Sequence, residues 1–194
     1  MKFRALHNTA VSYTDVKNQL WSVNNYHKQR WGMKSALGYY VGYNGFIDGD
    51  GTFTQTRLIG EETISVKGHN CDRPFTCDTV HFCFAFNGDR EVLNQAQRKT
   101  LKRLYNGEIN LKVTISDFDI TKLEDRFHRD LQANRTCPGK LITYDYIRDI
   151  LKDETMSHKE DLDNLQKKLT LIELLKKLVA LLQKQIDLII KKNT

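Results

Sequence analysis

The sequence lacks any apolar run long enough to cross a membrane, because charged residues interrupt each such run well short of about 18 residues. Its start, residues 1–7, also lacks the apolar segment of a secretory signal peptide. We therefore expect synthesis in a cytoplasm without a cleaved signal peptide. A substrate outside the cell would then be reached only with the help of another protein.

The sequence also lacks an obvious disulfide framework, although it contains four cysteines. Cys83 lies in an apolar run and is expected to be a small buried residue. Cys71 and Cys77 flank a loop and could form a bridge in an oxidising space, whereas cytoplasmic synthesis favours free thiols. Cys137, just before a Pro-Gly turn, is left as a candidate for chemistry.

The composition is that of an ordinary globular chain with an excess of positive charge. Its 194 residues suit one compact domain of about 150 residues plus an appendage. The net charge of +6 favours an anionic partner, either a nucleic acid or an acidic polymer, or serves solubility alone. The positive residues are scattered and no nucleic-acid-binding motif is visible, so we expect no nucleic acid partner.

Hydrophobic periodicity alternates between strand and helix along residues 1–151. Strands are expected at 2–7, 37–48, 53–57, 79–86 and 112–116, and helices from Thr14 to about 31, at 91–105 and at 141–151. The first helix would bury Val16, Leu20, Val23 and Tyr26, and the second Leu93, Ala96, Leu101 and Leu104. Residues 60–78 read as a long loop. Strands with helices on both sides predict an α/β (α+β) domain, with a central mixed sheet flanked by helices.

Residues 152–194 form a second predicted unit, a long amphipathic helix. Ser157 and Glu160 make a capping box. A heptad seam follows, and a second apolar stripe lies beside it; the seam is Ile172, Leu175, Val179, Leu182, Ile186 and Ile189, and the stripe is Leu171, Leu174, Leu178 and Leu181. Such a helix packs against copies of itself, folds back on the domain or lies on a membrane surface. We favour self-association into a homo-oligomer.

His7, His128 and Cys137 offer two imidazoles and one thiolate. This is a ligand set of catalytic zinc sites in which the fourth position stays open for water. The three residues lie far apart in the sequence, so the spacing alone is a weak signal. The fold must bring them together.

The segments between these residues strengthen the case through their order. In chain order they are residues 6–10 (Leu-His-Asn-Thr-Ala), 37–57 around the Gly-Asp-Gly turn, 68–70 (Gly-His-Asn), 80–89, 94–97, 128–130 (His-Arg-Asp) and 137–139 (Cys-Pro-Gly). This ordered set resembles the zinc-dependent N-acetylmuramoyl-L-alanine amidases that share a fold with peptidoglycan recognition proteins, especially phage endolysins. The resemblance covers roughly residues 2–150.

The resemblance implies that His7, His128 and Cys137 bind Zn²⁺, and that the substrate is the amide between N-acetylmuramic acid and L-alanine in bacterial peptidoglycan. Tyr43 stands where these amidases carry a tyrosine near the zinc. There it would orient the attacking water or donate to the developing oxyanion, although tyrosines in strands often serve packing alone. His69 resembles a groove histidine that contacts glycan or peptide, and a solvated loop histidine is the alternative.

Arg135 departs from the family pattern, since many phage relatives carry lysine two positions before the cysteine and others carry threonine. Arginine keeps the positive charge but cannot serve as a proton donor. We therefore expect electrostatic stabilisation from Arg135 and no acid catalysis.

The remaining signals are weaker. Residues 48–52 look like the start of a calcium loop, but Ile59 stands where the bidentate glutamate belongs, so a hairpin turn explains them better. His27 is expected on a helix surface or in the groove. His81 begins a strand and has no evident partner.

Three hypotheses about function follow. The first is a zinc amidase that lyses bacterial cell wall. The second is a non-catalytic peptidoglycan-binding protein, a class commonly marked by loss of the cysteine, whereas Cys137 is present. The third is a basic nucleic-acid-binding protein with an oligomerising helix.

Overall fold

The computed structural model describes residues 1–14, 18–64, 78–132, 135–152, 166, 168–179 and 181–183. Contacts between Cα atoms divide the chain into two units, Met1–Lys152 and Asp153–Thr194, and each is described by itself.

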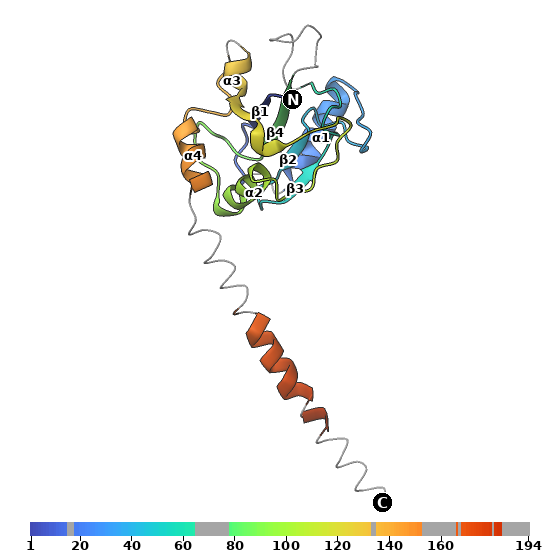
Figure 1. Ribbon diagram of the computed structural model, residues 1–194, viewed down its shortest axis with the longest axis vertical. Helices are drawn as coiled ribbons and strands as arrows, with labels where there is room; N and C mark the ends of the chain where they lie inside the picture. Colours follow the sequence, from blue (N-terminus) through green and yellow to red (C-terminus); the bar gives the residue numbers. More distant parts are fainter. Residues whose placement is uncertain are drawn as a thin grey trace, which may run out of the picture. The chain divides into compact units, whose positions relative to one another are not determined.

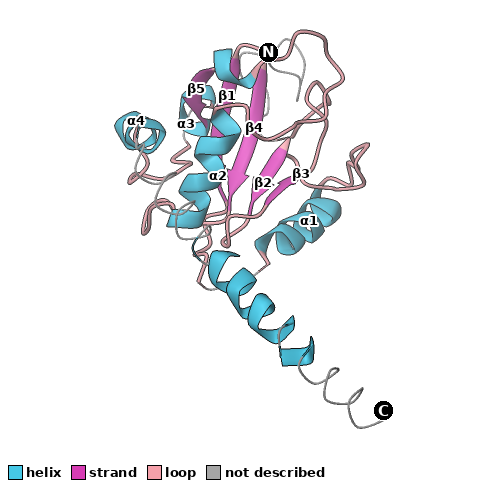
Figure 2. Cartoon of the chain, turned by 60° about the horizontal axis from the view of Figure 1, so that its bottom comes forward, coloured by secondary structure: helices cyan, strands magenta, loops and turns pink. Residues whose placement is uncertain are grey.

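A five-stranded mixed sheet forms the centre of the first unit. Its strands are β1 (Phe3–Asn8), β2 (Gly45–Ile47), β3 (Phe53–Gln55), β4 (Thr79–Phe84) and β5 (Glu124–Phe127). Their order across the sheet is β3-β2-β4-β1-β5, which Figure 2 shows from β3 at the right to β5 at the left. β1 is parallel to both β4 and β5, β2 is parallel to β4, and β3 is antiparallel to β2.

Helices cover both faces of this sheet. They are α1 (Gln19–Arg30), α2 (Gln95–Tyr105), α3 (His128–Leu131) and α4 (Tyr144–Lys152), with a 3-10 turn at Ile120–Lys122 (Figure 1). The predicted class, a central mixed sheet flanked by helices, is confirmed. β4 is buried along its whole length, as expected for an inner strand between two layers.

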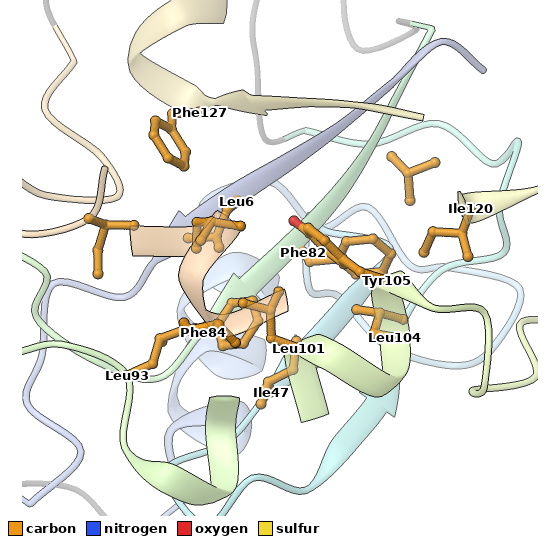
Figure 3. Close-up of a cluster of buried hydrophobic side chains, with 14 of the residues drawn as sticks. Leu6, Ile47, Phe82, Phe84, Leu93, Leu101, Leu104, Tyr105, Ile120 and Phe127 are labelled. Carbon is orange, nitrogen blue, oxygen red and sulfur yellow. The ribbon is translucent and has the colours of Figure 1, made fainter. Parts of the chain in front are cut away.

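The two faces of the sheet carry different side chains because successive residues of a strand point in opposite directions. On one face Leu6, Phe82 and Phe84 pack against residues of α2 and α4 in the main core (Figure 3). On the other face Cys83 lies in a smaller cluster that Leu20 and Val23 of α1 cover. His7 and His81 alternate with Leu6 and Phe82, so they belong to the α1 side.

The segment between α1 and β2 is held by a fully buried arginine. Arg57 donates from Nε to the Val41 carbonyl (2.7 Å) and from its guanidinium to the Met33 carbonyl (2.6 Å). It also pairs with Glu61 at 3.6 Å. These bonds fix the chain that leads to Tyr43.

The predicted starts of α1, α2 and α4 were all placed too early, and α4 begins at Tyr144 rather than at residue 141. α1 begins after Asn18, whose side chain accepts from the Trp21 N–H (3.0 Å), so Thr14 is not its N-cap. Its predicted buried face was partly wrong, because Tyr26 is 60% exposed. Val16 lies outside the described residues.

α2 begins after Asn94, which forms a capping box with Gln97. Leu93, Leu101 and Leu104 are buried as predicted, whereas Ala96 is exposed and Gln97 is buried in its place.

The strand predicted at 112–116 was wrong. Within that range Val113 makes an isolated bridge to Ile59 and no strand forms. The strand that completes the sheet is β5, whose sequence Glu-Asp-Arg-Phe carries three charges.

The described part of the second unit is helical, over residues 168–179 and 181–183. Its large apolar side chains are exposed: Leu169, Leu171, Ile172, Leu174, Leu175, Leu178, Val179, Leu181 and Leu182. The predicted capping box of Ser157 and Glu160 lies outside the described residues. In the part of the chain that the structure describes, no helix has the length and apolarity needed to span a membrane.

Candidate metal centre

Parallel pairing of β1 with β5 brings His7 and His128 to the same edge of the sheet. Leu6 pairs with Phe127, and each histidine is the next residue along its chain. The centroids of the two rings lie 4.7 Å apart. The pairing of β1 with β5 thus brings together two histidines that lie far apart in the sequence.

Cys137 is placed by a loop fastened to both α3 and β1. The N–H of Arg129 donates to the Cys137 carbonyl (3.0 Å), and the Arg129 guanidinium donates to the carbonyls of Gly139 (2.8 Å) and Ile142 (2.7 Å). The N–H of Asn8 donates to Cys137 Sγ (3.3 Å). The sulfur therefore faces the end of β1, and it lies 3.9 Å from His7 Nδ1.

Two glycines let this loop pack backbone against backbone. A Cβ on Gly88 would clash with the carbonyl of Pro138. Gly139 has φ +102°, a conformation that favours glycine, and a Cβ there would clash with the backbone of Gly88. The Pro-Gly pair after Cys137 thus lets the loop lie directly on the segment that follows β4.

The geometry fits a zinc ion. The ligand atoms of His7, His128 and Cys137 all lie within 4.8 Å of one another. Typical zinc bond lengths in a tetrahedral site put sulfur and nitrogen ligands about 3.6 Å apart, close to the separation between His7 and Cys137. The predicted ligand set is thus brought together, in a borderline-soft donor combination that suits zinc.

Burial controls the protonation of these three groups. It is the main cause that lowers the pKa of His7 and of His128, so both imidazoles are neutral at pH 7 and keep a free lone pair. It raises the pKa of the Cys137 thiol to about 12, against the opposing effects of the Asn8 N–H and of Arg129 and Arg135. A cation must therefore displace the proton of Cys137 in order to bind.

Tyr43 lies beside the candidate ligands. Its ring centroid is 4.9 Å from that of His7, and its carbonyl accepts from Thr56 Oγ1 (2.7 Å). Burial, followed by Cys83 and Cys137, raises the pKa of the phenol well above its usual value. Tyr43 is therefore a neutral O–H donor next to the site.

Of the other two predicted site residues, the structure describes one. Arg135 is exposed, and its positive charge adds to the lowering of the pKa of His128 and opposes the rise in the pKa of Cys137, so the charge lies within electrostatic reach of the site. His69 lies outside the described residues.

The sequence did not identify His81 as a site residue, because it showed no evident partner for this side chain. It is fully buried, and its Nδ1 lies 2.9 Å from His7 Nε2. The available signal was a histidine inside the apolar run 80–86, opposite the small residue Ala5 of β1. A pattern along one strand does not show what the neighbouring strand presents.

His27 is buried and not on a helix surface. Its Nδ1 accepts from the Gly42 N–H (2.9 Å), and burial lowers its pKa to about 4. Its ring lies between Trp31 and Tyr43, with centroid distances of 4.4 and 5.8 Å.

The similarity of this chain to known proteins lies in its fold. No family model matches the chain, and no curated protein matches it. Among solved structures it is similar to the N-acetylmuramoyl-L-alanine amidase LysC from Clostridium intestinale URNW, with a TM-score of 0.56 and 20% identity over 77% of this chain and 84% of that one.

Two further structures agree. The Ph2119 endolysin from Thermus scotoductus MAT2119 bacteriophage Ph2119 gives a TM-score of 0.54 and 15% identity over 77% of this chain and 83% of that chain. Drosophila PGRP-LB gives 0.53 and 16% over 78% and 80%. The fold of this chain is therefore one found in amidases, endolysins and peptidoglycan recognition proteins. At these identities the likeness concerns the fold alone.

Proposed function

We propose that this chain is a zinc-dependent amidase that hydrolyses the bond between N-acetylmuramic acid and L-alanine in bacterial peptidoglycan, an endolysin-type activity. The observation that carries the proposal is the convergence of His7, His128 and Cys137 within 4.8 Å. This convergence occurs in a fold that known amidases share. Retention of the cysteine favours catalysis over binding alone.

The chemistry of the reaction explains why a metal is needed. Amides resist hydrolysis at neutral pH because water is a poor nucleophile and the carbonyl a poor electrophile. When bound by three protein ligands, zinc lowers the pKa of water to roughly 7 and polarises a carbonyl oxygen. His7 would offer Nδ1, His128 a ring nitrogen and Cys137 its sulfur.

The side chains around the ligands supply the remaining functions. The neutral phenol of Tyr43 donates a hydrogen bond to the oxygen on which negative charge develops. Arg135 adds a positive charge near His128 and Cys137, but it transfers no proton at neutral pH because a guanidinium does not deprotonate.

Aromatic side chains beside the site support the binding of a large substrate. The ring of Tyr43 lies next to that of His7, and the ring of His27 lies between those of Tyr43 and Trp31. Trp31 is 46% exposed. Tyr26 lies next to Trp31, with ring centroids 6.2 Å apart. Exposed aromatic surface of this kind marks an interaction site, and the net charge of +6 suits an acidic wall polymer.

The decisive experiment measures zinc content and cell-wall lysis on one preparation, beside Cys137→Ala. We expect about one zinc per chain, loss of lysis on chelation and recovery when zinc is returned. Cys137→Ala should lose both zinc and lysis. Cys83→Ala is the matched control, because it also removes a buried thiol but should retain zinc.

The other outcomes are equally informative. Zinc binding without any turnover would favour a peptidoglycan-binding protein over an enzyme. Absence of zinc from the wild-type protein would contradict the proposal.

A further inference from the structure

His81 lies directly behind one of the candidate metal ligands. It is on β4, fully buried, and its ring centroid is 5.2 Å from that of His7 on the adjacent strand β1. Its Nδ1 and His7 Nε2 are 2.9 Å apart, a hydrogen-bonding distance. The other nitrogen of His7, Nδ1, faces Cys137 Sγ.

The second nitrogen of His81, Nε2, has no hydrogen-bond partner among the described residues. Among the residues that the structure describes, His81 Nε2 is the buried side-chain nitrogen or oxygen left without a hydrogen bond. An unpaired polar atom in the interior costs free energy, so an apolar side chain would serve stability better at this position. The bond to His7 is therefore the feature that explains an imidazole here.

The hydrogen bond between the two rings has a required direction if His7 binds a cation. Both rings are fully buried, and the protein interior favours the neutral form of an imidazole. A neutral imidazole has one N–H and one free lone pair. For His7 Nδ1 to offer its lone pair, the proton must sit on Nε2, and that N–H donates to His81 Nδ1.

We propose that His81 is a positioning residue that accepts the His7 Nε2–H and thereby fixes both the tautomer and the ring orientation of His7, with Nδ1 directed toward the metal. The identity of the metal as zinc rests on the proposed function. Metal-binding histidines generally donate their other N–H to an acceptor in this way, and removal of such an acceptor costs 10–100-fold in metal affinity.

His128 shows the same arrangement with a different acceptor. Its Nε2 lies 2.9 Å from Gln132 Oε1, four residues later in the chain. Each candidate imidazole ligand thus has a side-chain partner on one ring nitrogen, which leaves the other nitrogen for the site. In His7 that partner comes from a different strand.

The test compares His81→Leu, which removes the acceptor, with His81→Asn, which keeps an acceptor oxygen near the position of Nδ1. Zinc affinity is measured by competition with a chelator. We expect His81→Leu to bind zinc about 10–100-fold more weakly and His81→Asn to stay within a few-fold of the wild type. His27→Leu is the control, because it removes a buried histidine that does not contact His7 and should leave zinc affinity unchanged.

A second readout is independent of zinc. Long-range ¹H–¹⁵N correlation spectra of the metal-free wild-type protein report which nitrogen of His7 carries the proton, and we expect Nε2. In the metal-free His81→Leu variant the unpaired His81 Nε2 is removed, but His7 Nε2 loses its hydrogen-bond partner. The number of unpaired buried nitrogens is unchanged, so the thermal unfolding of the variant should resemble that of the wild type.

The two readouts separate the possible failures. A wild-type protein that binds no zinc would overturn the proposed function, while the tautomer of His7 would still decide the role of His81. A proton on His7 Nδ1, or wild-type zinc affinity in His81→Leu, would overturn the role of His81. If His81→Leu does not fold, the tautomer in the wild-type protein decides.

Discussion

At the scale of single residues, two opposing influences act on the pKa of the Cys137 thiol. Burial raises the pKa of its thiol to about 12, while Arg129, Arg135 and the Asn8 N–H favour the thiolate. The two imidazoles beside it are already neutral at pH 7. Protonation of the site is therefore set mainly by the sulfur.

This arrangement predicts the proton balance of metal binding. At pH 7 zinc binding should release at least one proton per chain, because Cys137 must lose its proton and a zinc-bound water with a pKa of roughly 7 loses part of another. Zinc affinity should accordingly rise about tenfold per pH unit below the pKa of Cys137. Calorimetry in buffers with different ionisation enthalpies measures the release. Release of clearly less than one proton would show that Cys137 is not a ligand.

Tyr43→Phe tests the hydroxyl next to His7. Loss of one preorganised donor to a developing oxyanion lowers kcat by about 10²–10³. We expect this fall with zinc affinity and KM unchanged, measured by steady-state kinetics on a muramoyl-peptide substrate and by chelator competition. Tyr39→Phe is the control, since Tyr39 packs in the same cluster but has no ring contact with His7 among the described contacts. A change confined to KM would assign Tyr43 to substrate binding.

The chemistry of the three candidate ligands was visible in the sequence, and their partners were not. Histidine and cysteine are common zinc ligands, so their presence suggests metal binding before the fold is known. The bond from His81 to His7 joins residues 74 positions apart and depends on which strands are neighbours. Only the pairing of β1 with β4 reveals it.

At the scale of elements, local signals placed the inner parts of the fold. The Gly-Asp-Gly turn correctly predicted the hairpin of β2 and β3, but the strand predicted at 37–48 is confined to Gly45–Ile47. The apolar runs of β1 and β4 correctly predicted two buried strands. Helix starts were less accurate, because Asn18 and Asn94 compete with other plausible caps earlier in the sequence.

The edge strand β5 shows where local pattern fails. Glu124, Asp125 and Arg126 are poor strand formers, and charged residues are common on the edges of sheets. β5 is fixed by its partner: it pairs with β1, and Arg4 of β1 bonds Asp125 at 2.7 Å. Its position follows from the tertiary structure and not from its own sequence.

At the scale of the whole molecule, the second unit is expected to determine the oligomeric state. Its described helix exposes nine large apolar side chains. The heptad seam in the sequence suits packing of this helix against the same helix of another copy of the chain. We propose that full-length chains self-associate through residues 153–194, and that residues 1–152 form the catalytic domain.

Light scattering after size exclusion tests this proposal. The full chain should be oligomeric, and a chain ending at residue 152 should be a folded monomer that keeps its zinc affinity. Leu175→Asp should weaken association, whereas Lys177→Asp, off the seam, should not. A full-length protein that stays monomeric at all concentrations would contradict the proposal.

The parallel pairing of β1 has a consequence during synthesis. β1 is translated first of the five strands, but its two neighbours in the sheet are β4 and β5, and Cys137 follows His7 by 130 residues. At a translation rate of roughly 5–20 residues per second, about 6–26 s pass between His7 and Cys137. During that interval the nascent chain contains His7 but not yet Cys137. The proposed three-ligand zinc site can therefore form only after Cys137 has been synthesised and β1 has paired with β5.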